Sequence, residues 1–391
     1  MSVSGTGKSP VAIFCPTFLK PEMLHVYRQV AGLRSVSPVV LAFKRENSDR
    51  FPFPNVRLVK RSSLRWLRRI WNVQIRKTPQ QAYRDELNSI RSLLSAERCE
   101  LLHIYFGNNG LFWLPLLRRS PIPVIVSFHG ADIHVNVGSK AARRLFAEMF
   151  DLCAVVLARS NSLAAALIEL GCSASKISIQ HAGIPLGAFR FIHRPKPEKG
   201  AWQLLQACRL IEKKGVNSTL QAFASFSAKH PHARLTIAGD GPLRESLEQL
   251  AINLDVADRV FFAGFVDQAT LLTLYQSSHF FVHPSEKPPD GDREGIPNSL
   301  LEAMATGLPC IATTHGGIPE AVIHMKSGIL VNESDREAIN HWLERLVCDD
   351  ALRESLGRGA AMAVETKFDL ADQIRELEHL YLKVASQYRP S

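Results

Sequence analysis

The stretch "DGDREGIPNSLLEAMATGLPCIATTHGGIPE", residues 290–320, decides the fold. Pro297 opens a pattern with helical spacing, and proline is well tolerated at the first position of a helix. The apolar run "LPCIATT" (308–314) then predicts a strand, which a Gly-Gly turn follows. Two acids, Glu294 and Glu302, flank the helix start. The stretch therefore predicts one helix–strand unit of a parallel sheet, with two acids whose purpose needs an explanation.

The same alternation of apolar runs and helical patterns extends along the whole chain. The runs cover 11–16, 38–43, 101–107, 124–130, 154–159 and 176–183 in the first half, and 202–208, 234–239, 260–265, 279–285, 308–314 and 328–331 in the second. This pattern predicts an α/β protein with two Rossmann-like, doubly wound parallel sheets. Such sheets bind ligands at the carboxyl ends of their strands. We therefore expect two domains that face a cleft lined by strand-end residues.

The domain boundary is expected in "FRFIHRPKPEKG" (189–200), which is rich in proline and charge and has no apolar period. A chain of 391 residues is long enough for two domains. The predicted domains are 1–195 and 196–369. A final helix within 370–391 lies beyond the second sheet, where it could cross back to the first domain.

Composition suits a globular protein, with 46% hydrophobic and 21% charged residues. No apolar run reaches the roughly 18–20 residues that span a bilayer, and the N-terminus does not resemble a secretory signal. Seven scattered cysteines without a CxxC pair indicate reduced thiols and not a zinc site. These features together favour a cytoplasmic protein.

The net charge of +10 is unevenly distributed along the chain. Residues 1–195 hold 27 Lys and Arg against 11 Asp and Glu, whereas residues 196–391 hold 20 against 26. The first half is therefore suited to an anionic partner, such as nucleic acid or an anionic membrane. The basic, tryptophan-containing stretch "KRSSLRWLRRIWNVQIRK" (60–77) has an apolar line at helical spacing, which fits a helix in a lipid headgroup layer. The same stretch could instead pack one face on the core or contact nucleic acid.

The helix that starts near Pro297 has two distinct stripes. Leu301, Met304, Ala305 and Leu308 follow core spacing, and Asn298, Glu302 and Thr306 share the opposite side. Two interpretations of Glu302 follow: a solvated surface acid, or a polar group that faces the cleft next to N–H groups able to bind an anion. Two acids beside a phosphate site make sense when they bind hydroxyl groups.

A second candidate is "CRLIEKKG" (208–215), directly after the first strand of the second half. Arg209 and Lys214 lie five residues apart around a turn that closes on Gly215. The segment is either a charged loop or a cationic clamp on a diphosphate. In "AGDGPLR" (238–244), Gly239 and Gly241 would let the backbone approach a ligand closely.

The first half offers "SFHGAD", with His129 and Asp132 at a strand end. A single histidine is more often structural than catalytic. The "DGD" at 290–292 is similar to a metal-binding Asp-x-Asp, but it adjoins a cationic clamp that would already neutralise a diphosphate. We therefore expect no metal site.

Taken together, these motifs resemble the retaining glycosyltransferases of family 4, which have the type B fold. Glu294 and Glu302 match their Glu-x7-Glu motif, and Arg209, Lys214 and Gly215 match Arg-x4-Lys-Gly. The "GIPNSLLEAMATGLPCIATTHGGIPE", "HIYFG" and "FHGADI" segments are similar to the branch that builds exopolysaccharides such as colanic acid. The resemblance covers about residues 100–365.

The resemblance implies a role for each matched residue. Arg209 and Lys214 would hold the donor diphosphate, Glu302 the ribose, and Glu294 the donor sugar, while His129 would contact that sugar from the first domain. Backbone at Gly295 and Ile296 would orient the sugar ring, and backbone at Phe265 and Val266 would meet the base. The activity implied is metal-independent, cofactor-free hexosyl transfer from a UDP- or GDP-linked sugar to a saccharide acceptor. The basic, tryptophan-containing stretch 60–77 adds the hypothesis that the acceptor is a lipid-linked saccharide and that the protein lies peripherally on the inner face of the plasma membrane. We expect no nucleic-acid partner.

Two other classes of function remain open. A nucleotide-sugar epimerase or a phosphorylase on the same fold would not need this acceptor. The other class is a basic nucleic-acid or membrane-binding module without catalysis. A nucleic-acid module would bind with a steep salt dependence and would be indifferent to Glu294.

Overall fold

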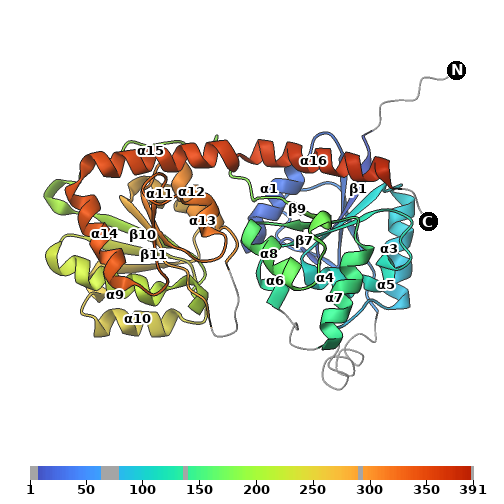
Figure 1. The fold of residues 1–391 in the computed structure, drawn as a ribbon, viewed down its shortest axis with the longest axis horizontal. Coiled ribbons are helices and arrows are strands. Elements are labelled where there is room, and N and C mark those ends of the chain that lie inside the picture. Colours follow the sequence, from blue (N-terminus) through green and yellow to red (C-terminus); the bar gives the residue numbers. More distant parts are fainter. Residues whose placement is uncertain (1–7, 63–78, 135–139, 289–293, 389–391) are drawn as a thin grey trace. The chain divides into compact units, whose positions relative to one another are not determined.

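The computed structural model describes residues 8–62, 79–134, 140–288 and 294–388. The chain divides into two compact units, and each is an α/β layer structure (Figure 1). Unit 1 comprises residues 1–183 and 370–391, and unit 2 comprises residues 184–369.

Unit 1 is built on a parallel sheet of seven strands in the order β5-β3-β1-β6-β7-β8-β9. The strands are β1 (Pro10–Phe14), β3 (Ser37–Ala42), β5 (Val56–Leu58), β6 (Leu101–Tyr105), β7 (Val124–Phe128), β8 (Val155–Ala158) and β9 (Ile177–Ile179), with β2 (Thr17–Phe18) and β4 (Lys44–Arg45) paired separately. The six strands predicted for this half are confirmed. β5 was not predicted, because its three residues are only partly buried or exposed and carry no apolar run.

Alternate residues of β1 belong to the two apolar layers of unit 1, as expected for a sheet covered on both faces. One face packs against α3 (Arg84–Ala96), α4 (Gly107–Phe112), α5 (Leu114–Leu117), α7 (Lys140–Leu152) and α8 (Asn161–Glu169). The other packs against α1 (Leu24–Gly32) and α16 (Leu370–Gln387). The short α6 (Ala131–His134) follows β7.

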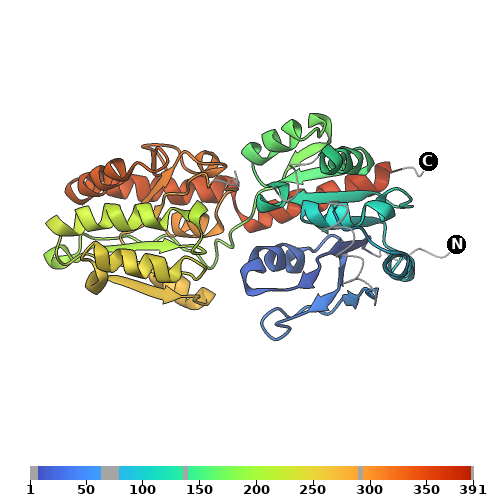
Figure 2. The ribbon, with the colours of Figure 1, turned by 90° about the horizontal axis from the view of Figure 1, so that it is seen from below.

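The C-terminal helix α16, red in Figures 1 and 2, belongs to unit 1 and packs beside α1. Its Glu378 accepts hydrogen bonds from the backbone N–H groups of Arg34 and Ser35, both at 2.5 Å. Tyr381 places its hydroxyl 2.5 Å from Nδ1 of His103 in β6. These contacts make α16 a structural part of unit 1.

Unit 2 has a parallel sheet of six strands in the order β12-β11-β10-β13-β14-β15. The strands are β10 (Gln203–Ala207), β11 (Arg234–Ala238), β12 (Val260–Gly264), β13 (Phe280–His283), β14 (Cys310–Thr313) and β15 (Ile329–Val331). All six predicted strands of the second half are confirmed. One face packs against α9 (Val216–Lys229), α10 (Arg244–Asn253) and α14 (Arg336–Cys348), and the other against α11 (Gln268–Ser277), α12 (Asn298–Ala305) and α13 (Ile318–Ala321), while α15 (Asp350–Lys367) contributes to both layers.

The boundary between the units lies at residues 183 and 184, and the predicted boundary at 195 was wrong. The proline-rich segment is fastened to unit 2 by Arg194, whose guanidinium donates to Thr306 O at 2.7 Å and to Ser278 O and Tyr275 O at 3.0 Å. Phe189 is buried in the same unit. Composition alone could not show that this polar segment is bound along a helix end.

Candidate active site

Lys214 is held at the carboxyl edge of the unit 2 sheet by a tight turn after β10. A 3-10 turn covers Glu212–Lys214, and Gly215 follows with φ of 61°. A Cβ atom on Gly215 would lie 1.9 Å from the carbonyl oxygen of Pro284, so the turn requires glycine. Gln206 of β10 donates to the carbonyl of Lys214 at 2.8 Å. The turn thus fixes Lys214 between the ends of β10 and β13.

Glu294 meets Lys214 in a buried ion pair. Lys214 Nζ lies 2.5 Å from Glu294 Oε2, and each side chain is 11% exposed. Burial raises the pKa of the Glu294 carboxyl, but the charges of Lys214 and Lys213 outweigh it and lower that pKa from 4.5 to about 2. Glu294 is therefore a carboxylate at neutral pH, able to accept hydrogen bonds but not to deliver a proton.

The segment "HGG" after β14 holds the backbone of Glu294 from both sides. His315 Nε2 accepts a hydrogen bond from the Glu294 N–H at 3.1 Å, and the Gly317 N–H donates to the Glu294 carbonyl at 3.1 Å. Gly316 has φ of 56°, and a Cβ atom there would lie 2.1 Å from that carbonyl oxygen. The Gly-Gly turn therefore lets one strand end approach and fix the acid that the preceding loop supplies.

His315 is itself oriented by a second acid. Its Nδ1 lies 2.7 Å from Glu333 Oε1, and the histidine is 2% exposed. Because Nε2 accepts from the Glu294 N–H, the proton of the neutral ring belongs on Nδ1, where it is donated to Glu333. Burial raises the pKa of Glu333, but hydrogen bonds from His315 and the Lys287 N–H lower it overall. Sequence reasoning missed both residues, although "TTHGG" places a histidine next to the turn.

Glu302 is buried, and its interpretation as a solvated acid was wrong. Leu300 to Ala305 are all buried, so this part of α12 is enclosed on every side. Of its polar stripe, Glu302 and Thr306 are buried and Asn298 is half-buried. Glu302 is 4% exposed and accepts a hydrogen bond from the Tyr275 hydroxyl at 3.2 Å. The helix begins at Asn298, and Pro297 is its N-cap and not its first residue.

Arg209 lies on the loop after β10 with an exposed side chain. The glycines of 238–244 shape this loop: a Cβ atom on Gly239 would lie 1.8 Å from Cys208 O, and one on Gly241 would lie 2.5 Å from Leu210 O. In the described structure, the close approach that these glycines permit is to the chain itself. They position the loop that carries Arg209.

The remaining predicted residues of unit 2 differ in exposure. Phe265, directly after β12, is 57% exposed, and Val266 packs partly against the core beside α11. Gly295 and Ile296 follow Glu294 and are half-buried, with Ile296 against the same core. Their predicted contacts with a base and a sugar ring remain predictions.

His129 belongs to unit 1, whereas the other predicted residues belong to unit 2. Its Nε2 lies 3.2 Å from the Ser127 hydroxyl, and its backbone N–H donates to Asp132 at 2.9 Å. Asp132 also accepts from the N–H groups of Gly130 at 2.9 Å and Gly107 at 2.8 Å. Burial, with the charge of Arg159, lowers the pKa of His129 well below its usual range. His129 is thus a neutral ring on a loop that Asp132 fixes.

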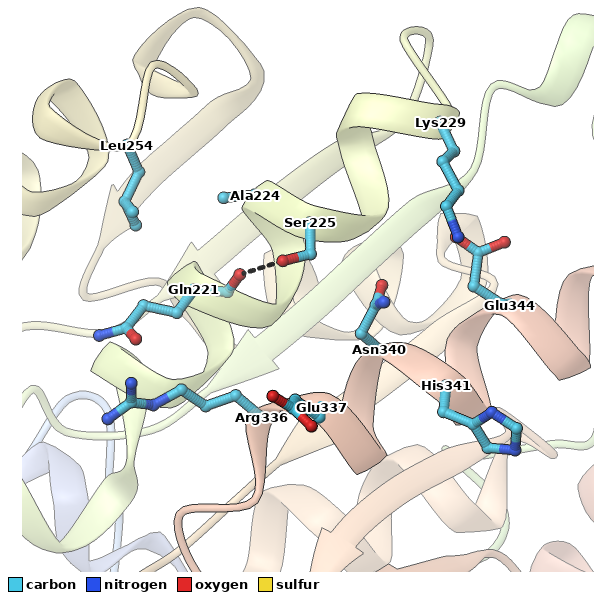
Figure 3. Close-up of a pocket in the computed structure, with 10 residues that line it drawn as sticks. All are labelled: Gln221, Ala224, Ser225, Lys229, Leu254, Arg336, Glu337, Asn340, His341 and Glu344. Atoms are coloured by element: carbon cyan, nitrogen blue, oxygen red, sulfur yellow. Dashed lines mark hydrogen bonds and ion pairs between the residues drawn. The ribbon is translucent and has the colours of Figure 1, made fainter.

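A groove of about 560 Å³ between α9 and α14 contains none of these residues (Figure 3). Glu344 of α14 connects the two sides of the groove, since its carboxylate lies 3.6 Å from Lys229 Nζ of α9 and 3.1 Å from Nε2 of the adjacent His230. The strand-end residues, and not this groove, form the candidate site of unit 2.

Two predicted features fall outside the described residues: the "DGD" at 290–292, and all but the first three residues of the stretch 60–77. Arg61, within the described part, stacks over the Phe43 ring at 4.1 Å. No cluster of three potential metal ligands occurs in the ranges that the structure describes. Within those same ranges, no helix is long and apolar enough to cross a membrane.

Family models match both units. A model described as Glycosyltransferase Family 4 matches residues 11–187, and one described as Glycosyl transferases group 1 matches residues 189–362.

Similar proteins act in polysaccharide biosynthesis according to their names. The chain is 31% identical to the amylovoran biosynthesis glycosyltransferase AmsK of Erwinia amylovora, over 73% of this chain and 70% of that protein. It is 30% identical to the putative colanic acid biosynthesis glycosyltransferase WcaL of Escherichia coli, over 62% of this chain and 60% of that protein.

Solved structures share the fold at low sequence identity. The sucrose-phosphate synthase from Thermosynechococcus elongatus has a TM-score of 0.75 at 19% identity, covering 97% of this chain and all of that one. Anabaena HepE in complex with UDP and glucose has a TM-score of 0.75 at 16% identity, covering 96% and 100%. The fold is that of the type B glycosyltransferases.

Proposed function

Because the chain belongs to family 4 of the glycosyltransferases, we propose that it moves a hexose from a nucleoside-diphosphate sugar to a saccharide acceptor, with retention at the anomeric carbon. The names of AmsK and WcaL support a role in building a surface exopolysaccharide. UDP in the HepE complexes supports a nucleotide-sugar donor.

The buried pair of Lys214 and Glu294 is the observation that carries the proposal. Lys214 has two N–H donors beyond the one directed at Glu294, and these would meet the diphosphate together with the exposed Arg209. Negative charge that develops on the leaving diphosphate would then face preorganised cations, which is how such sites stabilise a transition state. Glu294, kept ionised by Lys214, would accept hydrogen bonds from sugar hydroxyls.

Glu302 in this scheme binds the ribose, and backbone near Phe265 and Val266 meets the base. His129 of unit 1 contacts the sugar as a neutral ring. The cations at the diphosphate make a metal ion unnecessary, and the reaction needs no further cofactor.

A thermal-shift panel with UDP, GDP, ADP, CMP and NAD tests the donor site. A ligand at about a hundred times its Kd stabilises the protein by roughly 2.7 kcal/mol, and each kcal/mol raises the Tm by about 2–4 °C for a domain of this size. We expect a shift of several degrees with one nucleoside diphosphate, lost in Arg209→Ala. Arg336→Ala, which removes a cation from the α9–α14 groove, is the matched control and should keep the shift.

The stereochemical part is tested separately once the panel has named the base. Proton NMR of the product's anomeric signal, with the matching α-linked nucleotide hexose as donor, should show an α linkage. A β-linked product would contradict retention. Turnover of donor without any acceptor would instead favour the epimerase or phosphorylase.

We also propose that the acceptor is lipid-linked and that the stretch 60–77 contacts an anionic membrane. The support is its composition, with two tryptophans among basic residues. Vesicles of phosphatidylglycerol should co-sediment the protein, and phosphatidylcholine vesicles should not. Replacing Trp66, Arg68, Arg69 and Trp71 with Ser should abolish sedimentation, while Arg118→Ser with Arg119→Ser should leave it unchanged. Equal sedimentation of all variants would contradict the proposal.

A further inference from the structure

Arg159 occupies the carboxyl edge of the unit 1 sheet, next to His129. Phe128 of β7 pairs in register with Ala158 of β8, so the residues that follow, His129 and Arg159, leave neighbouring strands at the same level. On its other side, Arg159 Nη1 donates to the carbonyl of His181, after β9, at 3.3 Å. Three adjacent strand ends thus surround this guanidinium.

The guanidinium is buried and scarcely satisfied. Arg159 is 8% exposed, and the bond to His181 is the one hydrogen bond that its side chain makes to the described part of the chain. Arginine has five N–H donors, and an unpaired buried charge is costly. The burial of Arg159 lowers its pKa to about 10, which the attraction of Tyr105 and Asp132 does not offset.

The neighbouring side chains do not supply the missing anion. Both carboxylate oxygens of Asp132 already accept backbone N–H groups, from Gly107 on one side and from His129 and Gly130 on the other. The ring of His25, on α1, lies 5.5 Å from the ring of His129. Burial and the charge of Arg159 lower the pKa of His25 to about 3, so it is a neutral donor or acceptor.

The cluster is not fully enclosed. His25 and His129 are both half-buried, and Arg159 is 8% exposed. The planar fork of arginine matches the two oxygens of a carboxylate or a phosphate.

We propose that Arg159, with His25 and His129, forms an anion-binding subsite in unit 1 that takes a carboxylate or phosphate group of the saccharide acceptor. The inference rests on the proposed function for the identity of the acceptor, but the anion site itself does not. The acceptor is then an acidic saccharide or a phosphorylated one.

Calorimetric titration of the full chain tests this, with sodium phosphate, methyl glucuronoside and, as the neutral reference, methyl glucoside. We expect at least one of the two anions to bind at least tenfold more tightly than the neutral sugar. Arg159→Gln should weaken that binding at least tenfold, and Arg118→Gln, which removes an exposed arginine of the same unit, should not. Tighter binding of glucuronoside identifies a uronate acceptor, and tighter binding of phosphate identifies a phosphorylated one.

Phosphate could also bind to the cations of unit 2, so the phosphate titration is repeated with the Lys214→Ala variant. Binding that Lys214→Ala abolishes and Arg159→Gln retains would overturn the inference, as would equal affinity for all three compounds. The Arg159→Leu variant controls for loss of folding. Because it removes an uncompensated buried charge, its Tm without ligand should equal or exceed that of the wild type. A third variant, Arg159→Lys, separates binding from folding. If Arg159→Lys has a much lower Tm than the wild type but binds the anion equally well, Arg159 has a purely structural role. The nucleotide panel can succeed whatever the outcome, because it reports on unit 2.

Discussion

Each unit has a buried acid at the carboxyl edge of its sheet. The surroundings of the two acids shift their pKa values in opposite directions. Burial raises the pKa of both Glu294 in unit 2 and Asp132 in unit 1. Lys214 and Lys213 reverse that effect at Glu294, whereas backbone N–H groups at Asp132 do not, and its pKa stays raised. Neighbouring charge therefore decides the pKa of Glu294, and burial decides the pKa of Asp132.

The buried cations near these two acids, Lys214 and Arg159, differ in how they are paired. Lys214 has a carboxylate at 2.5 Å, but Arg159 lies among neutral histidines with one hydrogen bond to the described residues. Lys214 is paired before any ligand arrives, whereas Arg159 makes no ion pair with the described residues. A paired cation depends on its partner for stability, and an unpaired buried cation gains most from a bound anion.

The largest expected effect comes from breaking the balanced pair. Lys214→Met leaves a buried carboxylate without its cation, which we expect to lower the free energy of unfolding by roughly 3–5 kcal/mol. Urea titration at pH 7 measures it. Arg244→Met breaks the exposed pair with Glu248, which is 2.8 Å long, and should cost less than about 1 kcal/mol.

Adding Glu294→Gln to Lys214→Met should recover part of the loss, because the unpaired charge is then gone. If the double variant is no more stable than Lys214→Met, charge is not what the pair contributes.

The second effect concerns pH. The pKa of Glu294 is lowered on folding, from 4.5 to about 2, so its contribution to stability is present above pH 4.5 and is lost as the pH falls towards 2. The loss should amount to about 3 kcal/mol, since one pKa unit corresponds to about 1.4 kcal/mol. Urea titrations between pH 5 and 2.5 should give a shallower fall for Glu294→Gln than for the wild type. Parallel curves would contradict a lowered pKa.

The strands and the Lys214 turn were predictable because they depend on local patterns. Apolar runs report burial in a parallel sheet, and Gly215 marks a turn that tolerates no side chain. Those patterns located twelve strands of the two sheets and the segments that carry Lys214 and Glu294.

Features that depend on long-range contacts were not predictable. The segment 189–200 reads as a linker, yet Arg194 bonds to three carbonyls distant in sequence. Glu302 has the spacing of an exposed acid, but it is buried and accepts a hydrogen bond from Tyr275 of α11. Arg159 follows an apolar run without any motif, and only the strand register brings it beside His129.

The smallest expected effect tests whether His315 positions Glu294. His315→Leu leaves the Glu294 N–H and the Glu333 carboxylate without this partner, which we expect to lower the free energy of unfolding by about 1–3 kcal/mol. Gln at 315 can still accept from the Glu294 N–H through its side-chain oxygen, so His315→Gln should recover part of that loss.

Stability alone would not separate positioning from packing, so the donor turnover of the two variants decides it. If His315 holds Glu294 against the sugar, His315→Leu should reduce kcat by at least tenfold while the Kd for the nucleoside diphosphate, which meets Lys214 and Arg209, changes little. His315→Gln should restore kcat in proportion to the recovered hydrogen bond. Equal losses of kcat in both variants, or a loss in nucleotide affinity alone, would show that the histidine serves the fold of the loop and not the orientation of the acid.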